Sequence, residues 1–197
     1  IEQLHVAVGT HQDVAGLDVA MDHVLPMGVG QRLRDFDQQT QTRIDIVCPY
    51  FYPGRIFRRT LRGAAERGVR VRLLLQGKLD YRIAGLAAQV LYDELLSHGV
   101  QIYEYTPAFL HAKVALADDD WATVGSSNID PLSLLLNLEA NVVVRDARFS
   151  AALARAFEQA LAASREVTAP PVPRGWLATL RRGFVAWVAH WVMRVAG

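Results

Sequence analysis

The stretch from His111 to Glu139, HAKVALADDDWATVGSSNIDPLSLLLNLE, constrains the fold of this 197-residue chain more than any other. It opens within an apolar run, LHAKVALA, in which a period of two places His111 and Lys113 on one face of a strand. Three aspartates, Asp118 to Asp120, form a polar turn, and the pattern of Trp121 to Val124 is typical of a return strand. The stretch therefore predicts a β-hairpin that begins near His-x-Lys and ends in Gly-Ser-Ser-Asn.

Strand and helix patterns alternate around this hairpin. Strands are predicted over residues 44–48, 69–76, 100–105 and 139–144, and helices over 55–67, 83–98 and 147–163. Gly68 and Gly99 are placed to end the first two helices as C-caps. Such alternation predicts an α/β sandwich with a largely parallel mixed central sheet flanked by helices, in which functional sites gather at strand ends.

The two ends of the chain differ in pattern from the domain predicted over residues 43–167. Residues 1–42 form a poorly defined N-terminal segment, and residues 168–173 a proline-rich linker. Residues 174–197 carry tryptophans and other apolar residues at helical spacing, but arginines interrupt what would be a transmembrane helix. This pattern predicts an amphipathic helix in the membrane interface; the alternative is a helix docked on the protein's own core or on a partner chain.

The polar residues of the hairpin suit phosphate chemistry. Lys113 supplies a point charge for an oxyanion, and His111 can act as nucleophile or proton donor. The return of the hairpin brings Ser126 and Asn128 back as further donors, and Glu139 could orient the imidazole. A histidine in an apolar strand more often packs in the core, so each part alone has a structural explanation. Jointly, H-x-K-x4-D-x6-G-S-x-N specifies six residues within eighteen positions.

Composition narrows the possible partners. The formal net charge of +1 argues against nonspecific electrostatic binding of nucleic acid. The lone cysteine, Cys48, excludes a disulfide framework within the chain and is expected to pack as a small apolar residue. A cluster of arginines in and after the helix predicted at 55–67 is either a solvated face or an attachment face for anionic lipid. Its members are Arg55, Arg58, Arg59, Arg62, Arg67, Arg70 and Arg72.

The spacing of the hairpin motif matches the HKD signature of the phospholipase D superfamily. More narrowly, residues 43–167 resemble the C-terminal half of a bacterial cardiolipin synthase of the shorter, non-polytopic type. Besides the hairpin, the matching segments are PYFYPG, AAERGVRVRLLLQG and LLSHGVQIYEY. The resemblance covers roughly 125 of the 197 residues and implies a phospholipase D-like sandwich.

The resemblance also implies roles for individual residues. The implied catalytic set is His111, Lys113, Asp118 and Glu139, in which Glu139 supports the histidine and Asp118 completes the motif in a more structural role. Lys113, Ser126 and Asn128 would hold the phosphate. Cationic side chains take the place of a metal in this mechanism, so neither a metal nor another cofactor is expected.

The implied function is phospholipid biosynthesis, by a cardiolipin synthase-like phosphatidyltransferase that acts on phosphatidylglycerol through a phosphohistidine. Such a protein would sit peripherally on the cytoplasmic face of the bacterial inner membrane. The sequence has a single H-x-K, whereas the family's site uses two. The second half would come from a missing N-terminal half or from a homodimer. The alternatives are a single-motif homodimeric phosphodiesterase, either phospholipase D or nuclease, and an inactive lipid-binding remnant.

Overall fold

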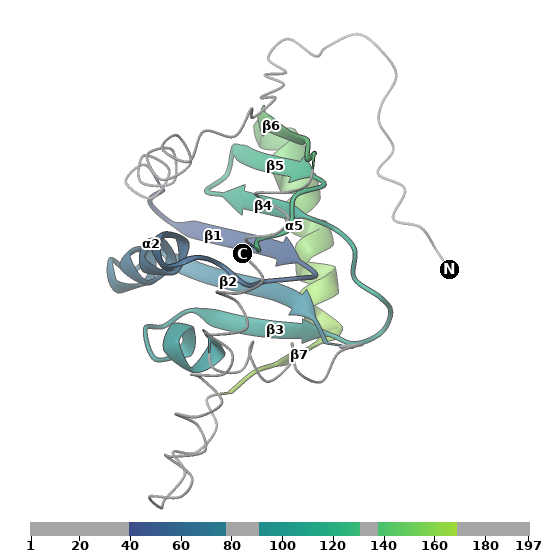
Figure 1. The fold of residues 1–197 in the computed structure, drawn as a ribbon. Coiled ribbons are helices and arrows are strands. Elements are labelled where there is room, and N and C mark those ends of the chain that lie inside the picture. Colours follow the sequence, from purple (N-terminus) through teal and green to yellow (C-terminus); the bar gives the residue numbers. More distant parts are fainter. Residues whose placement is uncertain (1–39, 78–90, 131–137, 169–197) are drawn as a thin grey trace, which may run out of the picture.

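A seven-stranded mixed sheet forms the centre of the molecule (Figure 1). The computed structural model describes residues 40–77, 91–130 and 138–168. Within these residues the strand order is β6-β5-β4-β1-β2-β3-β7. The N-terminal segment up to residue 39, most of the proline-rich linker and the predicted C-terminal helix lie outside the described residues. Among the helices of the described part, none combines the length and apolar character needed to cross a bilayer.

The parallel part of the sheet follows the predicted alternation of strands and helices. It consists of β1 (Arg43–Cys48), β2 (Arg70–Gln76) and β3 (Gln101–Tyr105), with β2 parallel to both neighbours. Helix α2 (Arg55–Glu66) connects β1 to β2, and residues 91–96 are the helical turns before β3. Gly68 and Gly99 follow these helices at φ values of 91° and 84°, where a residue without a Cβ avoids steric strain.

The other strands join antiparallel. The predicted hairpin is confirmed as β4 (Val114–Ala117) paired with β5 (Trp121–Gly125), and β6 (Asn141–Arg145) lies beyond it. The short strand β7 (Ser164–Glu166), absent from the sequence prediction, pairs with β3 at the opposite edge. The mixed sheet is therefore confirmed, but "largely parallel" was wrong. Two of the six strand pairs within the described residues are parallel, because the hairpin and β7 reverse direction.

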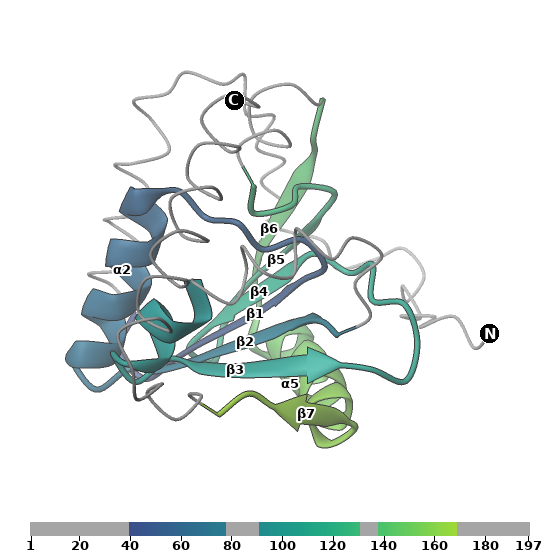
Figure 2. The same cartoon turned by 60° about the horizontal axis from the view of Figure 1, so that its bottom comes forward.

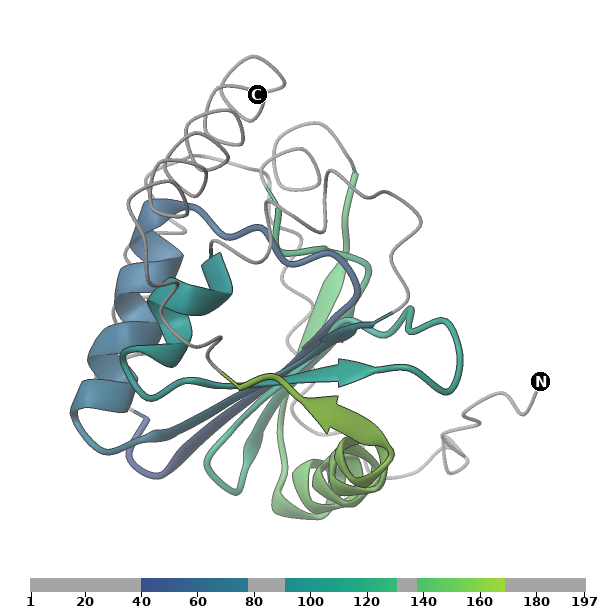
Figure 3. The same cartoon turned by 90° about the horizontal axis from the view of Figure 1, so that it is seen from below.

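Two apolar clusters lie on opposite faces of the sheet. Helix α2 and the helical residues 91–96 cover one face, and α5 (Ala147–Ala162) covers the other (Figures 2 and 3). The first cluster includes Ile44, Leu73 and Cys48, which is buried as predicted. The second cluster includes Leu74, Leu116 and Phe157 of α5. The alternation of Leu73 and Leu74 between the clusters shows that both faces of β2 are buried.

The predicted arginine cluster is not one surface. Arg72 is buried under α5, where its guanidinium binds both oxygens of Asp45, at 2.7 and 2.8 Å, and Glu158 at 2.7 Å. Arg58 and Arg62 on α2 both pair with Glu94. Arg72 therefore belongs to neither a solvated face nor an attachment face, because β2 points it inward, and two of the helical arginines share a carboxylate partner.

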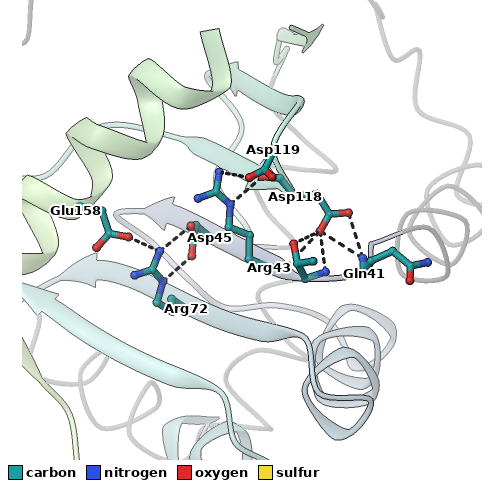
Figure 4. A network of polar contacts seen from close by, with 8 residues as sticks. Gln41, Arg43, Asp45, Arg72, Asp118, Asp119 and Glu158 are labelled. Carbon is teal, nitrogen blue, oxygen red and sulfur yellow. Dashed lines mark hydrogen bonds and ion pairs between the residues drawn. The ribbon is translucent and has the colours of Figure 1, made fainter. Parts of the chain in front are cut away.

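Asp118 closes the hairpin turn at the edge of the sheet where β1 begins (Figure 4). Its φ is +49°, and its Oδ1 accepts hydrogen bonds from the backbone of Thr42 at 2.8 Å and from the Thr42 hydroxyl at 2.7 Å. The amides of Gln41 and Arg43 also donate to the carboxylate. Partial burial raises the pKa of this carboxyl, but the bonds from Thr42, Gln41 and Arg43 outweigh burial and hold the pKa below its ordinary value.

We expect Asp118→Asn to lower the free energy of unfolding at pH 7 by about 1–2 kcal/mol. Asparagine tolerates positive φ, so the loss reports on the carboxylate rather than on backbone strain. Because the folded-state pKa is depressed, this stabilisation is present above the unfolded-state pKa of about 3.9 and disappears as the pH falls through the folded-state value. Urea unfolding at pH 7 and at decreasing pH measures the difference.

Asp119→Asn is the matched control for this prediction. The Asp119 side chain is 93% exposed and pairs with Arg43 at 3.5 Å, so its loss should change stability by less than about 0.5 kcal/mol. Equal effects of the two substitutions, or an Asp118 effect that does not vary with pH, would contradict the structural role assigned to Asp118.

Candidate active site

The segments that carry the predicted site residues, apart from Asp118, lie where the parallel strands β1, β2 and β3 end (the strands are labelled in Figure 1). Strand directions bring the ends of β1, β2, β3 and β5 to the same edge as the starts of β4 and β6. The segment of His111 and Lys113 enters β4 there, Ser126 leaves β5, and Glu139 precedes β6. Asp118 lies at the far end of β4, so the structure does not bring it to His111. The position of Asp118 favours the structural role that the resemblance implies for it.

His111 and Lys113 contact each other directly. The Lys113 Nζ lies 3.2 Å from the His111 Nε2 and also donates to the His111 carbonyl oxygen at 2.9 Å. An ammonium group has only donors, so this contact requires a lone pair on Nε2. The His111 side chain is exposed, which rules out the alternative of a core histidine. The pair therefore places an imidazole nitrogen beside an ammonium group, an arrangement that can attack or bind a phosphate.

Ser126 and Glu139 form a second polar unit at the same edge. The Ser126 hydroxyl donates to the Glu139 carboxylate and accepts from the Ala140 amide at 3.0 Å. The Ser126 amide binds the Ala140 carbonyl at 3.0 Å, and the Gly125 amide binds the Lys113 carbonyl at 3.0 Å. Backbone hydrogen bonds thus connect both polar units through the ends of β4, β5 and β6.

The segment that carries Asn128 is attached to the end of β1. Its neighbour Ile129 forms a bridge with Phe51, accepts a hydrogen bond from the Tyr52 amide at 2.6 Å, and donates to the Cys48 Sγ at 3.4 Å. Burial raises the pKa of the Cys48 thiol to about 11, although hydrogen bonds at Ile129 and Tyr50 lower it. Cys48 is therefore a neutral thiol at physiological pH that helps to hold this segment.

Two features of the site edge were not expected from sequence. Asn141 at the start of β6 donates to the Ser127 hydroxyl at 2.6 Å, and Gln76 at the end of β2 accepts from the Leu110 amide at 2.9 Å. Neither residue belongs to the hairpin motif. The only sequence signal for Gln76 is a polar residue at the end of an apolar strand. Of the aromatic residues after β1, Phe51 is buried and Tyr50 is exposed.

Residues 40–77, 91–130 and 138–168 contain no group of three or more His, Cys, Asp or Glu side chains that could hold a metal ion.

Gly125 should not tolerate a side chain. A Cβ at this position would lie 2.5 Å from the Ala140 carbonyl oxygen and would overlap the Asn141 side chain. We expect Gly125→Ala to separate the ends of β5 and β6 and to lower the free energy of unfolding by about 1–3 kcal/mol. Urea unfolding measures this loss, and Gly54→Ala is the control because its Cβ would meet nothing within 4 Å. A Gly125→Ala variant as stable as the control would contradict this packing.

Comparisons with known proteins show the family of this chain. The family model described as "Cardiolipin synthase, PLD-like domain" matches residues 34–161. Cardiolipin synthase B of Escherichia coli (strain K12) is 53% identical over 116 residues, which are 58% of this chain and 28% of the relative. The matched region therefore spans little more than a quarter of that relative's length.

Solved structures show the same fold. Nuc from Salmonella typhimurium, described as a phospholipase D family member, superposes with a TM-score of 0.63 at 18% identity, over 77% of this chain and 97% of that chain. The phosphatidylserine synthase of Haemophilus influenzae Rd KW20 superposes with a TM-score of 0.62 at 14% identity, over 85% of this chain and 44% of that chain. These likenesses confirm the phospholipase D-like fold. The match to the family model, together with the H-x-K pair at the sheet edge, shows that this chain belongs to the phospholipase D-like domain family of the cardiolipin synthases.

Proposed function

We propose that this chain supplies one half-site of a cardiolipin synthase-type phosphatidyltransferase that acts on phosphatidylglycerol. The observation that carries the proposal is the pair of exposed His111 and half-buried Lys113, with the two side-chain nitrogens 3.2 Å apart where the parallel strands end. The family model covers this part of the chain, and the 53% identity to cardiolipin synthase B supports a phospholipid as substrate.

The reaction needs two imidazoles, one of which is His111. One imidazole nitrogen attacks phosphorus, the bond from phosphorus to the glycerol headgroup oxygen breaks, and the other imidazole donates a proton to that oxygen. The hydroxyl of a second phosphatidylglycerol then gives its proton to the same imidazole and attacks the phosphohistidine. The phosphorus–nitrogen bond breaks, and cardiolipin leaves. Attack by water instead would give hydrolysis.

Lys113 is positioned to stabilise the developing charge on the phosphoryl oxygens. Its ammonium already lies beside Nε2, so it would approach an oxygen of a phosphate bound to that nitrogen. Asn128 and Ser126 are proposed as further donors to the phosphate. Glu139 is proposed to support His111; its hydrogen bond from Ser126 places its carboxylate at the same edge as the imidazole. Asp118 is proposed to act only through the fold.

The second half-site is proposed to come from another phospholipase D-like unit. The single motif here leaves two possibilities, a missing N-terminal half or a second copy of this chain. The first is supported by the short match to cardiolipin synthase B, which covers 28% of that relative. The second is supported by Nuc, in which one such unit makes up 97% of the compared chain.

The membrane location is also a proposal. We infer that the protein works at the membrane surface, as a phospholipid substrate requires, and peripherally on the cytoplasmic face of the bacterial inner membrane. The predicted amphipathic helix over residues 174–197 supports surface attachment through its tryptophans and arginines.

The variant His111→Ala tests the proposal. Purified chain in mild detergent, with its molar mass measured by light scattering, is incubated with phosphatidylglycerol, and cardiolipin is quantified by mass spectrometry. We expect His111→Ala to reduce turnover at least about a thousandfold, because the phosphohistidine or its proton donor is lost.

His98→Gln is the control for this experiment, because His98 binds the Glu94 carbonyl oxygen in the helical segment before β3, outside the site. It should keep wild-type turnover. Activity of His111→Ala near that of the wild type would overturn the assignment. Release of phosphatidic acid and glycerol without cardiolipin would replace the transferase with a phosphodiesterase.

A further inference from the structure

Gln76 is a buried polar side chain at the end of β2, and it binds the loop that leads from β3 to His111. It is 6% exposed and follows three buried leucines, Leu73 to Leu75. Its Oε1 accepts a hydrogen bond from the Leu110 amide at 2.9 Å, a contact across 34 positions in sequence. Leu110 is the residue immediately before His111.

The end of β2 holds the loop between β3 and His111 at both of its ends. The Gly77 amide donates to the Tyr105 carbonyl oxygen at 2.9 Å where the loop begins, and Gln76 binds Leu110 where it ends. The Leu110 side chain also packs against the apolar cluster under α5. Leu110 is therefore fixed through both its backbone and its side chain, and the Cα of His111 follows one peptide unit later.

We infer that Gln76 is a positioning residue for His111. It acts through Leu110, since its carbonyl oxygen fixes the backbone from which the imidazole extends toward Lys113. Gln76 and Leu110 lie outside the H-x-K motif, and the catalytic consequence of this contact rests on the proposed function. In-line attack on phosphorus needs reacting atoms aligned within a fraction of an ångström, so a loosened backbone before His111 should slow the chemical step more than it weakens substrate binding.

The test compares substitutions that remove or displace the acceptor. Gln76→Met keeps a similar unbranched shape without the carbonyl oxygen, and Gln76→Asn keeps a shorter amide whose oxygen lies further from Leu110. Gln101→Met is the matched control, since Gln101 is an exposed glutamine at the start of β3, on the far edge of the sheet. Each full-length variant is measured at a temperature at which circular dichroism shows it fully folded.

Three measurements are made on every variant. Hydrogen–deuterium exchange of the Leu110 amide reports on the contact itself. Turnover of phosphatidylglycerol gives kcat and KM, and titration with inorganic phosphate gives the Kd of the half-site even where no turnover occurs. The phosphate titration therefore reports on the half-site whether or not the isolated chain is active.

We expect Gln76→Met to accelerate Leu110 exchange at least about tenfold and to lower kcat by about ten- to a hundredfold, with KM within about threefold of wild type. The Leu110 exchange rate and the kcat of Gln76→Asn should lie between those of Gln76→Met and wild type. Gln76→Asn carries the test if Gln76→Met does not fold. Where the wild-type chain binds phosphate without turnover, as a lone half-site would, a severalfold rise in the phosphate Kd of Gln76→Met supports the positioning role, because inorganic phosphate contacts the half-site alone. A wild-type chain that neither turns over phosphatidylglycerol nor binds phosphate would contradict the proposed function instead.

Two results would overturn the inference. One is Leu110 exchange in Gln76→Met equal to that of Gln101→Met. The other is a Gln76→Met variant in which Leu110 exchanges faster while the phosphate Kd and any measurable kcat equal those of wild type. The contact would then hold the loop without affecting the site.

Discussion

Strand β4 lies between β1 and β5 and runs antiparallel to both, with Val114 opposite Val47 on one side and Val124 on the other. This pairing determines which residues reach the active edge. The residues that precede β4 emerge where β1, β2 and β3 end, so His111 lies among the loops that follow the parallel strands. Had β4 paired parallel, Asp118 would occupy that edge in place of His111.

The two sides of the sheet at which its strands begin and end carry different polar networks. At the edge where β1 begins, Asp118 accepts hydrogen bonds from the segment before β1, and it fixes the hairpin turn against that strand. Between the edges, the buried pair of Arg72 and Asp45 joins adjacent parallel strands and extends to Glu158 on α5 (Figure 4). Removal of one partner would leave a buried charge, so these contacts fix the pairing of β1, β2 and α5.

The active edge is held mainly by backbone hydrogen bonds and small residues. Gly125 allows the end of β5 to approach β6 closely enough for Ser126 to bind Glu139 and Ala140. Gln76 and Cys48 belong to neighbouring strands and bind the segments of Leu110 and Ile129. The reactive side chains thus lie on loops, while the groups that hold those loops are buried in the sheet. This division gives an exposed imidazole a defined backbone position.

Local periodicity and fixed spacing were enough to predict the hairpin, the helices with their glycine caps and the clustering of His111, Lys113 and Ser126. The burial of Arg72, the added strand β7 and the three antiparallel pairs outside the hairpin, counted over the described residues, could not be predicted in this way, since they depend on which segments meet across the sheet. The contact of Gln76 with Leu110 belongs to the same class. A side chain that binds a backbone amide 34 positions away leaves no local pattern in the sequence.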